Sequence, residues 1–255
     1  MSRHIPRVIP ILLLDNKGLY KTQKFKNPKY VGDPLNAVKI FNEKEVDELI
    51  FLDINATIQQ REPNLVYLEQ LASECFMPLC YGGNVRTVKT IKDLIKTGIE
   101  KVSINSFAIE SPSFIKEASA NFGSSTIVVS VDIKKNIFGK YELYNKAKVK
   151  TKYSNPFEFA ALMNEMGAGE LLITSVDKEG TLSGYDLELI KKITSEVDIP
   201  VIANGGASTV VDFKEAVKEA GASAVAAGSM FVFHGALRAV LITYPEQDEL
   251  KQVFA

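Results

Sequence analysis

Short apolar runs alternate with segments of helical periodicity along the whole chain. The apolar runs of strand length cover residues 7–14, 48–53, 78–81, 101–105, 126–132, 170–174, 200–203 and 222–226. Between them apolar residues recur every three or four positions, and Pro34 and Pro112 stand where two of the helices are expected to begin. Strands that alternate with helices form parallel sheets, and eight such units predict one (β/α)8 barrel.

Two stretches depart from this alternation. Residues 15–33 are polar and are predicted to form a long loop. Residues 133–153 are rich in lysine and tyrosine, with a turn signal at 136–139, and predict a hairpin inserted on the carboxyl-terminal face of the barrel. Residues 245–255 are expected to form a short final element. No linker or low-complexity segment interrupts the chain, so residues 1–255 are predicted to be a single domain.

The second half of the chain repeats features of the first. Gly82-Gly83 precedes Gly205-Gly206 by 123 residues, and Asn105-Ser106 precedes Gly228-Ser229 by the same interval. Matched segments at one offset indicate a duplicated half-barrel. Glycines let a backbone approach a ligand closely, and N–H groups at the start of a helix bind phosphate. The two copies predict a substrate with a phosphate at each end, although either copy alone could simply form tight turns.

Composition excludes several classes of partner and site. The 255 residues carry a formal net charge of −1, so no bulk field favours nucleic acid or anionic membrane. Cys75 and Cys80 are too few for a disulfide framework, which favours a reduced cytoplasmic setting. With only His4 and His234, and no CxxC motif, neither a metal site nor a cofactor is predicted. His234 is interpreted as an exposed helix cap. No apolar run is long enough for a signal peptide or a membrane span.

Polar residues at the carboxyl ends of the predicted strands are the candidates for chemistry, because active sites of such barrels lie there. Asp132 ends a strongly apolar strand and could act as a general acid or base, or could order the hairpin that follows. Asp53 ends another strand and could contact a ligand or accept hydrogen bonds from loop N–H groups. Thr174 is a further strand-end candidate, and Glu179 and Gly180 lie either beside the phosphate or in an ordinary turn.

The opposite ends of the strands carry charges where apolar packing is normal. Arg7, Glu48, Lys101 and Glu170 each lie at or near the first residue of a predicted strand. Two cations and two anions can neutralise one another in a closed ring across the bottom of the barrel. Such a ring is either a structural plug or a gate over an axial path.

Several motifs together resemble the HisF family, the cyclase subunit of imidazole glycerol phosphate synthase, over nearly the full chain. They read DELIFLDI (47–54), KVSIN (101–105), IVVSVDIK (127–134), GAGELLITSVDKEGTLSGYD (167–186) and NGGA (204–207), with the glycine pair at 82–83. The resemblance implies a (β/α)8 TIM barrel of the ribulose-phosphate-binding type, with a HisH-like glutaminase docked on its amino-terminal face. It also implies that ammonia passes a charged gate, whose residues match Arg7, Glu48, Lys101 and Glu170.

The resemblance also assigns the substrate site. The family grips a bisphosphate by motifs that match Gly83, Asn105 and Ser106 at one end. The motifs at the other end match Gly180, Gly205, Gly206, Gly228 and Ser229.

One position departs from the family pattern. The family uses two aspartates as an acid–base pair, and the second matches Asp132. The first falls on Leu13, aligned through RVIPILLLDNK (7–17). Leucine cannot transfer a proton, and loss of one member of such a pair costs factors of about 10² to 10⁴. Asp15 lies roughly 6–7 Å further along the strand and is a poor substitute.

Further features are similar to a HisF-like branch found with surface-polysaccharide genes, called WbuZ or glycosyl amidation-associated protein. They are Tyr81, Asn84, Glu179, the leucines at 12–14 and the segment YVGDPLNAVKIFNEKEVDEL (30–49). That branch is thought to supply ammonia, with a HisH-like glutaminase, to a separate sugar amidotransferase.

Three hypotheses follow. The first is an ammonia-conducting barrel that serves amidation of a nucleotide sugar in surface-polysaccharide (lipopolysaccharide) biosynthesis. The second is a genuine cyclase (lyase) of histidine biosynthesis that tolerates Leu13. The third is a non-catalytic module that binds a phosphorylated metabolite.

Overall fold

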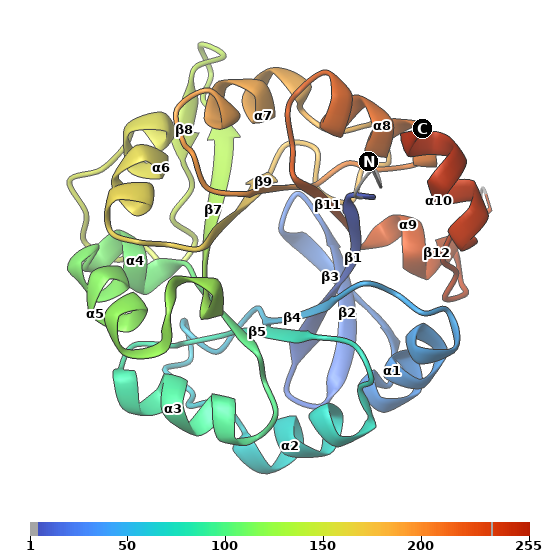
Figure 1. Ribbon diagram of the computed structural model, residues 1–255, viewed down its shortest axis with the longest axis horizontal. Coiled ribbons are helices and arrows are strands. Elements are labelled where there is room, and N and C mark those ends of the chain that lie inside the picture. The colour runs from blue at the N-terminus through green and yellow to red at the C-terminus, as the bar shows by residue number, and fades with distance from the viewer. Residues whose placement is uncertain (1–4, 236) are drawn as a thin grey trace.

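The computed structural model describes residues 5–235 and 237–255, and across them eight parallel strands close into a barrel inside a ring of helices (Figure 1). In chain order the barrel strands are β1 (Arg7–Asp15), β4 (Leu49–Asp53), β5 (Leu79–Gly82), β6 (Lys101–Ile104), β7 (Ile127–Lys135), β9 (Glu170–Ser175), β10 (Val201–Asn204) and β11 (Ala224–Ala227). Each pairs with the next, and β11 pairs with β1, which closes the barrel and confirms the predicted fold class.

The helices follow the strands as the hydrophobic periodicity predicts. They are α1 (Pro34–Glu43), α2 (Leu65–Glu74), α3 (Val88–Lys96), α4 (Ser106–Glu110), α5 (Ser113–Phe122), α6 (Pro156–Glu165), α7 (Leu187–Thr194), α8 (Val210–Lys218), α9 (Ser229–Val232) and α10 (Gln247–Phe254). Pro34 begins α1, as expected, and the Asp33 side chain accepts the Asn36 N–H at the cap. The predicted helix at Pro112 is preceded by an additional short helix, α4, which begins at Ser106.

Residues 15–33 form a β-hairpin, so the prediction of a loop there was wrong. β2 (Gly18–Gln23) pairs antiparallel with the end of β1, and β3 (Lys26–Gly32) pairs with β2. The outward side chains of this hairpin are polar, which hid its strands in the sequence, although Leu19 and Lys21 are buried. The hairpin covers part of the carboxyl-terminal end of the barrel, behind the strands in Figure 1.

Within residues 133–153, β7 continues past the barrel to Lys135 and pairs antiparallel with β8 (Tyr141–Leu143). A short hairpin of β12 (Phe233–His234) and β13 (Ala239–Val240) follows α9. His234 is exposed and lies in β12, so its interpretation as a helix cap was wrong, because the chain leaves α9 as a strand at Phe233. His4 lies outside the described residues.

Two apolar layers hold the barrel together. The larger packs the outer faces of the strands against the helices. The smaller fills the barrel interior and consists of Ile9, Ile11, Ile50, Cys80, Val128, Leu172, Ile202, Ala224 and Ala226. Branched and small apolar side chains are the usual filling of such a barrel, and they leave the two ends as the places for polar chemistry.

Candidate functional site

A cavity opens at the carboxyl ends of the barrel strands. All twelve of the predicted catalytic and ligand-binding positions line it: Leu13, Asp53, Gly83, Asn105, Ser106, Asp132, Thr174, Gly180, Gly205, Gly206, Gly228 and Ser229. They come from loops and strand ends spread across both halves of the sequence. The fold therefore brings the candidate residues into one continuous cavity, which we call the mouth.

Asp132 is a partly buried carboxylate of the mouth with polar partners on both sides. Its neighbours come from the two adjacent strands, because Asn105 follows β6 and Thr174 is directly opposite Asp132 on β9. The Asn105 Nδ2 donates to Asp132 Oδ2 at 2.9 Å. Burial raises the pKa of Asp132 to about 7, even though hydrogen bonds from Asn105 and Thr174 lower it. A carboxyl group with that pKa can exchange protons near neutral pH.

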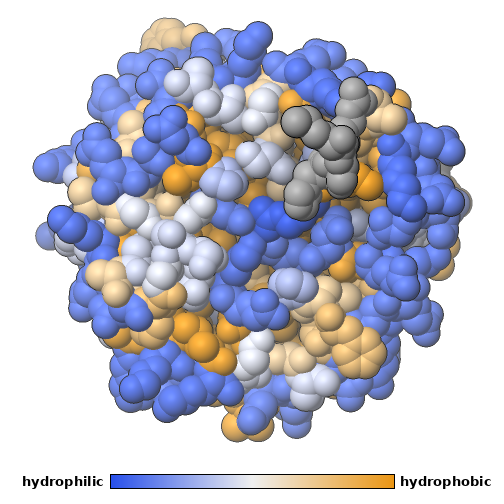
Figure 2. Space-filling view, in the orientation of Figure 1, coloured by the Kyte–Doolittle hydropathy of each residue, from blue (hydrophilic) through white to orange (hydrophobic). Residues whose placement is uncertain are grey.

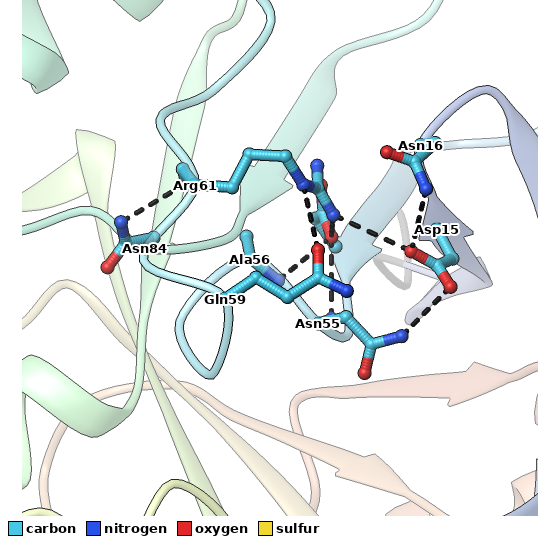
Figure 3. A network of polar contacts seen from close by, with 8 residues as sticks. Asp15, Asn16, Asn55, Ala56, Gln59, Arg61 and Asn84 are labelled. Atoms are coloured by element: carbon cyan, nitrogen blue, oxygen red, sulfur yellow. Dashed lines mark hydrogen bonds and ion pairs between the residues drawn. The ribbon is translucent and has the colours of Figure 1, made fainter.

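Leu13 lines the same mouth from β1 and packs against the interior apolar layer. Asp15, the next residue on the same side of the strand, does not line the mouth. Its carboxylate accepts a hydrogen bond from Asn55 Nδ2 at 2.9 Å and lies 3.6 Å from the Arg61 guanidinium (Figure 3). These contacts hold Asp15 at the outer edge of the barrel, so it does not take the place of an aspartate at position 13.

Asp53 uses both of its oxygens within the protein. Arg61 binds it through two hydrogen bonds of 2.6 and 3.0 Å, and the N–H groups of Asn55 and Ala56 donate to Oδ1. Arg61 in turn connects Asp53 with Asp15 in the network of Figure 3. This geometry agrees with the alternative interpretation of Asp53, as an acceptor that orders the loop after its strand.

The repeated Gly-Gly and small-polar motifs occupy matching places in the two halves. Asn105 and Gly228 are the residues before the short helices α4 and α9, which begin at Ser106 and Ser229. Gly206 has a φ of +114°, and a Cβ there would collide with the carbonyl oxygen of Gly184, so only glycine fits. The residues at these two helix starts line the mouth from opposite half-barrels, and N–H groups at helix starts are suited to binding anionic groups.

Lys21 is a mouth residue that the sequence analysis missed. It lies on β2, is only 4% exposed, and its Nζ donates to the Ile11 carbonyl oxygen. A Cβ on Gly228 would collide with this Nζ, so the ammonium lies directly against one of the two helix starts. Burial lowers the pKa of Lys21 to about 8, and Glu179 opposes that shift. Leu19 and Lys21 are two positions apart and both face inward. This alternation indicates a strand within residues that were predicted to form a loop.

Glu179 holds the β2–β3 hairpin over the mouth. Its carboxylate accepts from Thr22 Oγ1 and from the Phe25 N–H, both at 2.9 Å. Its backbone carbonyl accepts from the Lys24 N–H at 2.9 Å. The contact ties the loop after β9 to the hairpin after β1.

At the other end of the barrel four charges form a closed ring. Arg7 donates to Glu48 and, at 2.9 Å, to Glu170; Lys101 donates to the same two glutamates at 2.8 and 3.1 Å. The Glu48 side chain is 2% exposed and Lys101 17% exposed, so the ring lies within the barrel end and not on a solvated rim. Above it, the buried thiol of Cys80 belongs to the interior apolar layer. We call these four residues the basal ring.

Two oxygens of the basal ring are buried without a hydrogen-bond partner among the described residues, Glu48 Oε1 and Glu170 Oε2. Within the same described ranges, no group of three or more His, Cys, Asp or Glu side chains is arranged to hold a metal ion. None of the described helices combines the length and the apolar character needed to cross a bilayer.

Comparison with known proteins gives one consistent result. Residues 7–238 match the model of a family described as "Histidine biosynthesis protein". The chain is 47% identical over 244 residues, 96% of its length and 97% of the relative's, to "Putative imidazole glycerol phosphate synthase subunit hisF2" of Pseudomonas aeruginosa. It is 40% identical over 228 residues, 89% of its length and 90% of the relative's, to the imidazole glycerol phosphate synthase subunit HisF of Alkaliphilus metalliredigens.

Proposed function

The chain belongs to the histidine biosynthesis protein family, among its HisF proteins, and from this premise we propose that it conducts ammonia within a glutamine amidotransferase assembly. In this proposal a HisH-like glutaminase on the amino-terminal face releases ammonia, which crosses the barrel axis. The ammonia serves amidation of a nucleotide sugar for surface polysaccharide, carried out by a separate amidotransferase.

The observation that carries the proposal is the contrast between the two ends of the barrel. The basal ring is complete, with each cation bonded to both glutamates. The mouth has Asp132 on one side and Leu13 on the other, and Asp15 is bound to Asn55 and Arg61 instead. This barrel keeps the basal ring at the entrance but has one proton-transfer group fewer in the mouth. It is therefore better suited to delivering ammonia than to cyclising a substrate.

The amino-terminal face has features suited to a docked glutaminase. Figure 2 views the molecule from the amino-terminal ends of the strands and shows a hydrophilic patch at the centre, with paler and hydrophobic residues beside it. Phe76, just before β5, is 87% exposed on this side. Aromatic side chains such as this one are enriched at protein interfaces relative to the rest of a protein surface.

The mouth supports a second part of the proposal, that a phosphorylated ligand binds there. Two helix starts and the adjacent Lys21 ammonium offer donors for anionic oxygens, and the lining between them is largely apolar. We assign this site to a phosphorylated small molecule, held at its two ends by the Gly83–Ser106 side and the Gly205–Ser229 side.

A genuine cyclase of histidine biosynthesis is the alternative function within the same family. The test is turnover of the bisphosphate aminoimidazole carboxamide ribonucleotide by the purified protein with ammonium salt. We expect turnover at least about 10²-fold below that of a HisF protein with both aspartates. Turnover equal to such a protein would overturn ammonia delivery as the main role.

A non-catalytic phosphometabolite-binding module is the third possibility. It predicts no response of a glutaminase to this chain. We expect glutamine hydrolysis by the HisH-like partner to rise when the complex forms, which a coupled glutamate assay measures. A glutaminase that neither binds the barrel nor gains activity would leave only the binding role.

A further inference from the structure

Positive charge is concentrated in one segment on the carboxyl-terminal side of the barrel. Residues 133–153 contain seven lysines, at 134, 135, 140, 146, 148, 150 and 152, against the single acidic residue Glu142. This gives the segment a formal charge of +6 in a chain whose net charge is −1. A local excess of this size attracts an oppositely charged surface even when the whole molecule is nearly neutral.

Most of these charges are available to a partner. Six of the seven lysines are exposed, and Lys146 is partly buried. Among the described residues only Lys135 of the seven lies within ion-pair distance of a carboxylate, Asp186, at 3.9 Å. The positive potential of the segment is therefore not cancelled within the chain itself.

Two large apolar side chains stand at the tip of the β7–β8 hairpin. Ile137 is 93% and Phe138 87% exposed, and in Figure 1 the hairpin projects past the ring of helices beside α7. Adjacent side chains of this size, both almost fully in water, are costly unless they are covered in a complex.

Hydrogen bonds of Asn136 order the turn at the tip of the hairpin. The Asn136 Oδ1 accepts from the N–H groups of Phe138 and Lys140 at 2.9 and 3.1 Å, and its Nδ2 donates to Glu142 Oε1 at 2.7 Å. The backbone of Asn136 also bonds to Gly139 and Lys140. Preorganised apolar anchors of this kind lose little entropy on binding.

The same segment returns to the rim of the mouth. The Tyr144 N–H donates to the Asp132 carbonyl oxygen at 2.7 Å, and Lys146 and Ala147 line the mouth itself. The Tyr144 ring also contacts Phe25 of the hairpin after β1, with ring centroids 5.7 Å apart. A protein held by residues 134–152 would therefore lie beside the opening through which ammonia leaves.

We propose that residues 134–152 dock the enzyme that consumes the ammonia, through an acidic surface that carries an apolar pocket for Ile137 and Phe138. This inference rests on the proposed function, because it requires ammonia to leave the mouth for a second active site. Charge complementarity selects an acidic partner. The exposed apolar pair favours a folded protein with a pocket over a purely polyanionic ligand. Because the segment continues to the rim of the mouth, the active site of that protein would lie where ammonia leaves the barrel.

The test compares two sources of ammonia for the acceptor amidotransferase, in the complex of barrel, glutaminase and acceptor. We expect the variant Ile137→Ser/Phe138→Ser to reduce glutamine-dependent amidation at least tenfold at limiting protein. Amidation driven by ammonium salt, and glutamine hydrolysis by the glutaminase, should keep wild-type rates. Lys148→Glu/Lys150→Glu should give the same pattern, since both lysines are exposed.

Matched controls are available on the opposite side of the barrel and on another helix. Val66→Ser removes an apolar side chain that is 69% exposed on α2 and should change nothing. Lys214→Glu/Lys218→Glu makes the same charge change on the exposed face of α8 and should leave glutamine-dependent amidation intact.

The outcomes separate the two proposals. If the wild-type barrel supports glutamine-dependent amidation and the hairpin variants support it equally well, the docking surface is refuted and ammonia delivery stands. If the wild type supports none, ammonia delivery fails and the docking proposal fails with it. Binding of the wild type to phosphatidylglycerol vesicles or to a DNA oligonucleotide, lost in the hairpin variants while amidation is unchanged, would instead assign the segment to a membrane or a nucleic acid.

Discussion

At the scale of single residues, the mouth depends on the pair of positions 13 and 132. Asp132 has a pKa of about 7 because it is buried, with Asn105 and Thr174 as partners. Leu13 offers no proton and instead extends the interior apolar layer to the mouth. Under the proposed function, proton transfer in this barrel is limited because leucine stands where the family resemblance implies a carboxylate.

Leu13→Asp should raise ammonium-dependent turnover of the bisphosphate aminoimidazole carboxamide ribonucleotide. A second proton-transfer group in such a pair contributes factors of about 10² to 10⁴, and the two helix starts that we propose bind phosphate already line the mouth. Product formation under single-turnover conditions measures the gain.

Leu13→Asn is the matched control, because asparagine has nearly the same shape as aspartate, is also polar, and cannot act as an acid or base. Equal turnover in the aspartate and asparagine variants would show that position 13 does not limit the reaction.

Asp132 should also make stability depend on pH. Its pKa is about 7 in the folded protein against an ordinary value of 3.8, so folding takes up a proton between those values. The folded state is favoured below about pH 4, and this contribution is lost as the pH rises through 7. Between pH 5 and 8 the free energy of unfolding of wild type should therefore fall, relative to Asp132→Asn, by roughly 2–3 kcal/mol.

Urea unfolding of both proteins at the two pH values measures this difference. The buried Lys21, whose pKa is about 8, is common to both proteins and cancels in the comparison. A difference that stays constant from pH 5 to 8 would mean that Asp132 titrates far below neutrality.

At the scale of elements, the basal ring is made by the first residues of four different strands. β1, β6 and β9 begin at Arg7, Lys101 and Glu170, and Glu48 immediately precedes β4. Each side chain points inward because the strand that follows fixes its direction. The alignment of the strands therefore brings the four side chains together. Replacing one of them can open the ring while all strands stay in place.

Lys101→Ala should lower glutamine-dependent amidation without lowering ammonium-dependent amidation. Arg7 still bonds to both glutamates in this variant, so the fold is kept, while the ring opens on one side. Ammonia then exchanges with bulk water, and glutamine-dependent amidation should fall about tenfold, equivalent to ~1.4 kcal/mol, with ammonium-dependent amidation unchanged. The ratio of the two rates is the measured quantity.

Lys89→Ala is the control, since Lys89 forms an exposed ion pair with Asp93 on α3 and takes no part in the ring. A parallel loss of both activities in Lys101→Ala would argue for a structural plug and against a gate.

The barrel elements could be predicted because a buried parallel strand reads as an unbroken apolar run. The motifs at strand ends could be predicted because the duplication placed them at one offset. The β2–β3 hairpin could not, since most of its outward positions are polar and only a few inward positions, such as Leu19 and Lys21, are buried. Lys21 was missed for the same reason, because only the hairpin brings its ammonium to Gly228.

At the scale of the whole molecule, the two ends of the barrel are separated by an apolar interior in which, among the residues that the structure describes, the Cys80 thiol is the one ionisable group of the cluster. Burial raises the pKa of this thiol well above its usual value, so it stays neutral. Along the barrel axis, the basal ring supplies charged groups at one end, and the mouth with its adjacent basic segment supplies them at the other. A neutral molecule can cross such an interior far more readily than an ion, which favours ammonia over ammonium.

The two helix starts of the mouth should act together on one ligand. The bisphosphate aminoimidazole carboxamide ribonucleotide can engage both, so its second phosphate binds at a high effective concentration. At 100 times its dissociation constant a ligand adds about 2.7 kcal/mol to stability. At roughly 2–4 °C per kcal/mol for a chain of this size, the melting temperature should rise by about 5–10 °C. Inorganic phosphate at twice the molar concentration should give a much smaller rise.

Gly228→Ala tests the geometry behind this expectation. Gly228 has a φ of −118°, which alanine adopts without strain, and the atoms nearest to the new methyl group are the flexible end of Lys21 and the Ile11 carbonyl oxygen. The variant should fold normally, displace the Lys21 ammonium and obstruct one helix start. Its melting temperature should then respond to the bisphosphate no more than to inorganic phosphate. A full bisphosphate response in this variant would mean that the ligand is held from one half-barrel alone.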